Sequence, residues 1–105
     1  MTPYSYPGLN VESNESILNQ ALKKVLSIPQ FAHLTRKDIL GNARHTDKAQ
    51  ARHALRYYIY RRTGMKKHPA YRPKCNHATV INSIKRVENM EVGNPQLYKQ
   101  IMSKL

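Results

Sequence analysis

The four consecutive residues Asn76, His77, Ala78 and Thr79 carry small or polar side chains at a point where a helix is expected to begin. Asparagine is a strong helix N-cap, and apolar residues recur after it at helical spacing, namely Val80, Ile81, Ile84 and Val87. The backbone N–H groups of a first helical turn favour phosphate oxygens, and DNA-reading proteins commonly place such a turn in the major groove. His77 and Thr79 are therefore candidate contacts to bases or phosphates. The alternative is that this run only solvates a capped helix end.

A long basic stretch without carboxylates surrounds this run. The chain has 18 Lys and Arg against 6 Asp and Glu, a net charge of +12. No acidic residue occurs from Lys48 to Arg86, whereas 11 basic residues do: Lys48, Arg52, Arg56, Arg61, Arg62, Lys66, Lys67, Arg72, Lys74, Lys85 and Arg86. This distribution favours a nucleic-acid partner, although basic faces also serve solubility and acidic protein partners. Charge alone does not distinguish DNA from RNA.

Catalytic and metal-binding patterns are missing from the sequence. There is no P-loop glycine pattern, no G-x-S-x-G elbow, no H-E-x-x-H and no obvious pair of carboxylates. We therefore expect no enzymatic activity, no cofactor and no small-molecule substrate. Cys75 and His77 are two imaginable metal ligands, but no further Cys or His pair completes a tetrahedral site, so no metal is expected.

The compartment and the domain limits follow from local composition. The single cysteine excludes an internal disulfide and favours a cytosolic protein. The opening MTPYSYPGLN lacks the pattern of a secretion signal, and no apolar run approaches the length of a membrane span, so no membrane is expected among the partners. Residues 1–12 are expected to form a flexible N-terminal arm, and residues 13–105 one helical domain.

Local start and stop signals predict the helices in the first half of the domain. A first helix is capped by Ser13 or Asn14 and ends before Pro29. A short second helix starts at a capping box formed by Thr35 and Asp38. Gly41 is expected to end it in the left-handed conformation.

The second half of the domain is predicted in the same way. A third helix runs from near Thr46 to a stop at Gly64, with an apolar stripe of Ala51, Ala54, Leu55, Tyr58 and Ile59, and with Arg52 and Arg56 on another face. A basic loop follows over residues 65–75. The helix that begins at Asn76 stops near Gly93. A last helix is capped by Asn94, starts with Pro95 and has an apolar face of Leu97, Tyr98, Ile101, Met102 and Leu105.

These elements predict an all-α fold, a compact bundle of about five helices. Tyr57, Tyr58 and Tyr60 have the side chains to stack on unpaired bases. On a helix at this spacing, at least Tyr58 is better interpreted as a core residue. Binding to single strands therefore ranks below binding to a duplex.

Three segments, in order, carry a resemblance to a known family. These are LTRKDILGNAR at 34–44, ARHALRYYIYRRTG at 51–64 and NHATVINSIKRVENM at 76–90. They resemble the short helix with its basic loop, the long central helix and the D-H-T/A-T-V signature of the C-terminal, origin-binding domain of the DnaA replication initiator family. The resemblance spans roughly Glu15 to Leu105. It implies a Trp-repressor-like helix-turn-helix that binds double-stranded DNA.

The resemblance also implies roles for individual residues. Arg44 matches the basic-loop arginine that enters the minor groove, and Arg52 and His53 stand where the family has an Arg-Gln pair near DNA. Asn76, His77 and Ala78 would contact the major groove and Thr79 the phosphate backbone. The basic loop is expected to add phosphate contacts through its lysines, Lys66, Lys67 and Lys74.

The sequence departs from the family pattern in several places. Asn76 replaces the usual Asp, so an acceptor for cytosine becomes an amide suited to adenine N6 and N7, and Ala78 offers only a methyl group to thymine. His53 replaces Gln. The first helix of the helix-turn-helix is replaced by MKKHPAYRPKC, about two residues shorter and with two prolines, Pro69 and Pro73. None of the three segments resembles the ATPase domain of the initiator, so we expect no ATP hydrolysis.

The expected function is sequence-preferring binding of duplex DNA in replication control or transcription regulation. The expected location is the bacterial cytoplasm with the nucleoid, or the virion and infected cell if a bacteriophage or mobile element encodes the chain. Replication or virion proteins would be further partners. One alternative is a packaging protein with a degenerate helix-turn-helix that coats nucleic acid without reading it. Another is a module that docks on an acidic protein or on RNA.

Overall fold

The computed structural model describes residues 14–41, 45–71 and 76–105. Within these residues the chain forms five α-helices, one 3-10 turn and no strand. The elements are α1 (Asn14–Leu26), η1 (Pro29–Phe31), α2 (Arg36–Leu40), α3 (Thr46–Thr63), α4 (His77–Gly93) and α5 (Pro95–Met102). The predicted all-α bundle of five helices is confirmed.

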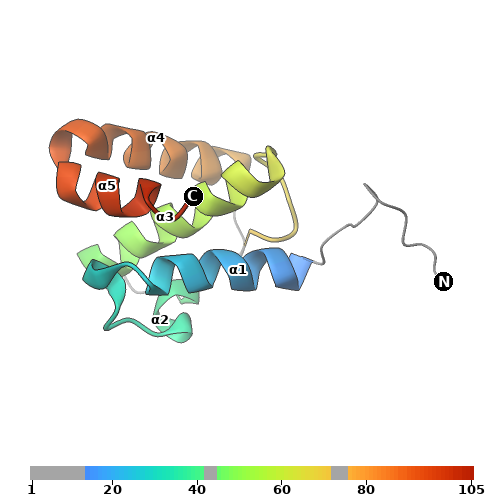
Figure 1. Cartoon of the computed structure of the whole chain (residues 1–105). Coiled ribbons are helices and arrows are strands. Elements are labelled where there is room, and N and C mark those ends of the chain that lie inside the picture. Colours follow the sequence, from blue (N-terminus) through green and yellow to red (C-terminus); the bar gives the residue numbers. More distant parts are fainter. Residues whose placement is uncertain (1–13, 42–44, 72–75) are drawn as a thin grey trace.

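The longest helix, α3, is the centre of the bundle. It packs against α1, η1 and α2 on one side and against α4 on the other, while α5 folds back along α4. Figure 1 shows α4 and α5 above α3 and α1 and α2 below it. Because α3 and α4 make the most extensive helix pair, α3 determines how α4 is presented to a partner.

Three of the predicted helix starts are confirmed by their hydrogen bonds. Thr35 and Asp38 form both halves of a capping box at α2. The side chain of Asn76 accepts from the backbone N–H of Thr79 at the start of α4, and Asn94 caps α5, with a proline in the first turn. The predicted cap Ser13 of α1 lies outside the described residues.

The two predicted glycine stops differ. Gly64 ends α3 in the left-handed conformation with φ 70°, as expected. Gly41 was expected to do the same for α2 but has φ −84° and ψ −170°, an extended conformation. The prediction for Gly41 is wrong, because the chain leaves α2 in an extended direction rather than turning back at once.

The core is built from the predicted apolar faces. The whole stripe of α3, from Ala51 to Ile59, is buried, together with the inward faces of α1 and α4. Leu97 and Ile101 of α5 are fully buried, but Leu105 is 48% exposed. Leu105 was expected on the apolar face of the last helix; that helix ends at Met102, so the residue lies past it.

The segment between α3 and α4 is not helical over residues 64–71, the part of it that the structure describes. Its turn is held from within: the backbone N–H of Ala70 donates to His68 Nδ1 at 3.1 Å, and the Tyr71 hydroxyl donates to the carbonyl of Met65. Ala70 and Tyr71 are buried against the core. The predicted loop is confirmed here, and these residues supply no first helix for a helix-turn-helix.

Candidate nucleic-acid interface

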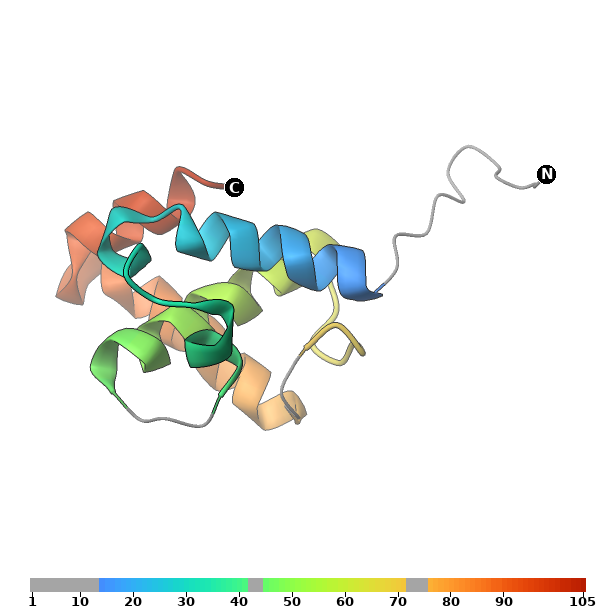
Figure 2. The same ribbon diagram turned by 90° about the horizontal axis from the view of Figure 1, so that it is seen from below.

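The first turn of α4 is exposed at one edge of the molecule. Figure 2 shows it along the same edge as α2 and the start of α3, away from α1. Asn76, His77 and Ala78 are all exposed. Within the described residues, the backbone N–H groups of His77 and Ala78 have no hydrogen-bond acceptor, as expected for the first turn of a helix. This turn therefore offers two N–H donors to a ligand.

The cap changes what Asn76 and Thr79 can offer. Asn76 Oδ1 accepts from both the backbone N–H of Thr79 at 2.8 Å and its hydroxyl at 2.9 Å. The Asn76 amide thus has only its NH₂ group left, whereas pairing with adenine N6 and N7 needs the oxygen as well. The Thr79 hydroxyl already donates its hydrogen and has only lone pairs for a ligand. Both expected contacts would require the cap to open.

Arg52 lies in the interior rather than at the surface. It is 9% exposed, and its guanidinium donates to the carbonyl oxygens of Ile39 at 2.8 Å and Asp38 at 3.0 Å. Burial lowers the pKa of Arg52 from its ordinary value. Two of its donors are thus turned towards the last carbonyls of α2, and its contact with DNA stays a prediction.

His53 is half-buried at the contact between α3 and α4. Its Nδ1 lies 2.9 Å from the hydroxyl of Ser83, which also accepts from Arg56 at 3.1 Å. Burial, followed by the charges of Arg56, Arg86 and Arg52, lowers the pKa of His53 to about 4, so its ring is neutral at pH 7. These contacts are all satisfied when the Ser83 hydroxyl accepts from Arg56 and donates to His53 Nδ1. The neutral His53 ring then has its hydrogen on Nε2.

The remaining predicted contacts divide into two groups. Lys66 and Lys67 are exposed in the segment before α4, where solvated ammonium groups can reach a phosphate. Arg44 and Lys74 lie outside the described residues.

No acidic residue lies in the first turn of α4. Two of the described carboxylates pair with cations in the first half of the bundle, Glu15 with Arg36 at 3.9 Å and Asp38 with Lys48 at 3.3 Å, and Asp47 contacts His33 at 3.2 Å. The other two, Glu88 and Glu91, lie near Tyr98, since burial and then these carboxylates raise the pKa of that tyrosine. The Thr35 N–H and Lys48 hold the pKa of Asp38 below its ordinary value.

The tyrosines of α3 are not presented for stacking on bases. Tyr57 and Tyr58 are 5% and 3% exposed, which confirms Tyr58 as a core residue. The Tyr58 hydroxyl donates to the carbonyl of Ile101 at 2.7 Å, and burial raises the pKa of Tyr58. Tyr60 is partly buried against the core.

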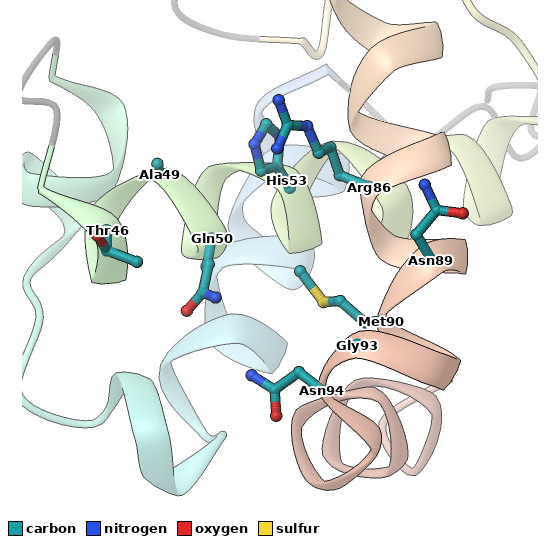
Figure 3. Close-up of a pocket in the computed structure, with 9 residues that line it drawn as sticks. All are labelled: Thr46, Ala49, Gln50, His53, Arg86, Asn89, Met90, Gly93 and Asn94. Atoms are coloured by element: carbon teal, nitrogen blue, oxygen red, sulfur yellow. The ribbon is translucent and has the colours of Figure 1, made fainter.

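Sequence reasoning missed a groove between the first half of α3 and the end of α4. Its volume is about 490 Å³. Its walls include Gln50, His53, Arg86, Asn89, Met90 and Asn94 (Figure 3). These residues are distant in the sequence, and the one signal that could have pointed to them is that no carboxylate occurs from Lys48 to Arg86.

Comparison of the chain with models of known families, with curated protein sequences and with solved structures found no match. Across the part of the chain that the structure describes, no helix has the length and apolar character needed to cross a membrane. The same residues contain no cluster of three or more His, Cys, Asp or Glu able to hold a metal ion. Cys75, one of the two imaginable ligands, lies outside them.

Proposed function

We propose that this chain binds double-stranded DNA and prefers certain sequences, with the first turn of α4 directed at the duplex. The observation that carries the proposal is the exposed turn whose N–H donors at His77 and Ala78 have no acceptor among the described residues, preceded by the exposed Lys66 and Lys67. N–H donors at a helix start bind phosphate oxygens, and flanking lysines add affinity by releasing counterions. The chain acts here as a binding protein rather than an enzyme.

The resemblance of three segments to the DnaA C-terminal domain supports the same orientation of α4 and favours a role in replication control or transcription regulation. Under this proposal Arg44 enters the minor groove. Base contacts come from His77 and the methyl group of Ala78, because the Asn76 oxygen is occupied by the cap.

A second candidate is DNA coating without base selection. The observation that favours it is also at the cap: with the Asn76 oxygen and the Thr79 hydrogen both occupied, few side-chain groups remain to read bases. Residues 64–71 are not helical, so this part of the segment before α4 does not form the first helix of a helix-turn-helix.

Selection from a random duplex pool, followed by anisotropy titrations of the winning duplex, a scrambled duplex and an RNA, separates these functions. We expect one enriched motif, bound on the order of a thousandfold more tightly than the scramble. Binding without enrichment would support coating. Tighter binding to RNA, or no binding to any of the three, would contradict the DNA proposal.

Paired charge variants test which surface is used. Lys66→Ala with Lys67→Ala should reduce the slope of log affinity against log salt by roughly 2, since each phosphate contact contributes about 1. Lys99→Ala with Lys104→Ala removes the same charge from the C-terminal end and should leave the slope nearly unchanged. Equal effects of both pairs would mean that only net charge matters and that the α4 surface is wrongly assigned.

A further inference from the structure

The groove between α3 and α4 has the size of a small-molecule site. Its volume of about 490 Å³ falls within the roughly 300–1,000 Å³ typical of ligand pockets. Figure 3 shows Gln50 and Asn94 extending from opposite walls, with Met90 to one side of them on α4 and the His53 ring beside the Arg86 guanidinium at one end. The lining thus has a polar end, two facing amides and an apolar floor.

Three hydrogen-bond acceptors of these walls are occupied within the protein. Gln50 Oε1 accepts from Gln30 Nε2 at 3.4 Å, and Asn94 Oδ1 accepts from the backbone N–H of Leu97 at 3.4 Å. The acceptor position of His53, Nδ1, is engaged by Ser83. The amide NH₂ groups of Gln50 and Asn94 and the Nε2–H of His53 remain. The groove therefore offers donors and suits a ligand rich in acceptors.

The positive charge of the groove also favours a ligand rich in hydrogen-bond acceptors. Arg86 is exposed at its rim, and no carboxylate is among the residues that line it. The positive charges of Arg56 and Arg86 both act on His53, as its lowered pKa indicates. A guanidinium beside an N–H donor is an arrangement that binds phosphate oxygens through charge-assisted hydrogen bonds.

The space and the apolar floor exceed what a bare phosphate needs. Met90 supplies a flexible thioether surface, and Ala49 adds a small apolar wall. These surfaces suit the flat face of an organic ring, while side-chain amides suit the edge of a nucleobase.

We propose that this groove binds a nucleotide, with its phosphate on Arg86 and His53 and its base or sugar between Gln50 and Asn94 over Met90. The nucleotide is either free in solution or part of a nucleic-acid strand, and the phosphate chemistry is the same in both cases. The strand case needs an unpaired nucleotide, so neither case rests on the proposed binding of a duplex at the first turn of α4.

Chemical-shift titration of the ¹⁵N-labelled chain with adenosine monophosphate tests the inference. Saturable shifts at residues lining the groove are expected, with inorganic phosphate and adenosine each binding more weakly than the nucleotide. Arg86→Gln should weaken binding about tenfold or more, the effect of losing a charge-assisted hydrogen bond. Lys85→Gln is the matched control, since it removes the same charge from the next residue of α4, outside the groove, and should leave affinity unchanged.

A trinucleotide strand distinguishes the two sources. Binding of the monophosphate that depends on Arg86 assigns the free nucleotide; binding of only the trinucleotide, again dependent on Arg86, assigns the strand. Three results would overturn the inference. They are chemical-shift changes at residues outside the groove, equal losses of affinity in Arg86→Gln and Lys85→Gln, and inorganic phosphate that binds as tightly as the nucleotide. Lys66 and Lys67 lie outside the groove. If their alanine variants lose duplex binding but still bind the nucleotide, the groove is a separate site from the surface of the proposed function.

Discussion

Arg52 donates from Nε to the carbonyl oxygen of Ile39 at 2.8 Å, and from Nη2 to the carbonyl of Asp38 at 3.0 Å. The last carbonyls of a helix have no partner within it, and a cation is favoured at that end by the helix dipole. A side chain from the centre of the bundle thus completes the C-terminal end of a helix of only five residues. The two hydrogen bonds of Arg52 link α3 to the end of α2.

Arg52→Ala should lower the free energy of unfolding by roughly 2 kcal/mol, because one buried and one partly buried carbonyl lose charge-assisted hydrogen bonds. Urea unfolding measures this effect, with Arg62→Ala on the exposed side of α3 as the control, expected to change stability much less. Duplex affinity of the fully folded Arg52→Ala protein should stay close to that of the original chain. Unchanged stability with lost affinity would support Arg52 as a DNA contact.

Acid should destabilise the protein through His53. Its pKa of about 4 in the folded state lies below its ordinary 6.5, so the unfolded chain binds the additional proton as pH falls between these values. The free energy of unfolding should therefore decrease from about pH 6.5 to about pH 4, in the window of these two pKa values. Denaturant midpoints across this range measure the slope. His53→Gln should flatten it, and His77→Gln, at an exposed position, should not; identical slopes in all three proteins would refute this assignment.

Two substitutions at the cap of α4 separate stability from binding. Asn76→Ala should cost about 1 kcal/mol of stability through loss of the N-cap. Asn76→Asp should keep the cap and the stability, because aspartate caps equally well and its charge suits a helix N-terminus. One carboxylate oxygen would form the cap and the other could accept from cytosine N4, so Asn76→Asp should change which duplex sequence is preferred. Thermal unfolding and selection from a random duplex pool together test this; an unchanged preference in Asn76→Asp would place the base contacts elsewhere.

Tyr58→Phe should reduce stability by about 1 kcal/mol, because the carbonyl of Ile101 loses its buried hydrogen-bond donor. Tyr57→Phe is the comparison, since the Tyr57 hydroxyl donates only to the sulfur of Met102, a weak acceptor, at 3.9 Å and otherwise accepts from Arg61. Urea unfolding of both variants measures the difference. A larger loss in Tyr57→Phe would contradict the assigned contacts.

Helix starts could be predicted from the sequence because caps are local. Thr35 with Asp38, Asn76, and Asn94 with Pro95 each act within four residues of chain, so residue type and spacing carry most of the information. The stop at Gly41 failed because the direction in which a chain leaves a helix depends on what it meets next.

The candidate site was less predictable. An arginine one position from the apolar stripe of α3 is expected to be solvated, and only the tertiary packing of α2 reveals that Arg52 is inside. The groove depends on Gln50 and His53 meeting Arg86 and Asn94, more than thirty residues later. No local sequence pattern predicts that these residues lie close together. The occupation of the Asn76 oxygen by the cap is likewise visible only from the hydrogen bonds of the structure.

The positions of the carboxylates also bear on how the molecule meets a partner. Of the five described, Glu15, Asp38 and Asp47 each contact a basic side chain, and Glu88 and Glu91 lie on the flank of α4 near Tyr98. Glu88 and Glu91 thus place negative charge on one flank of a strongly positive molecule. Such an asymmetric field exerts a torque during diffusion and turns that flank away from an approaching polyanion. Part of the orientation is then set before the first contact forms.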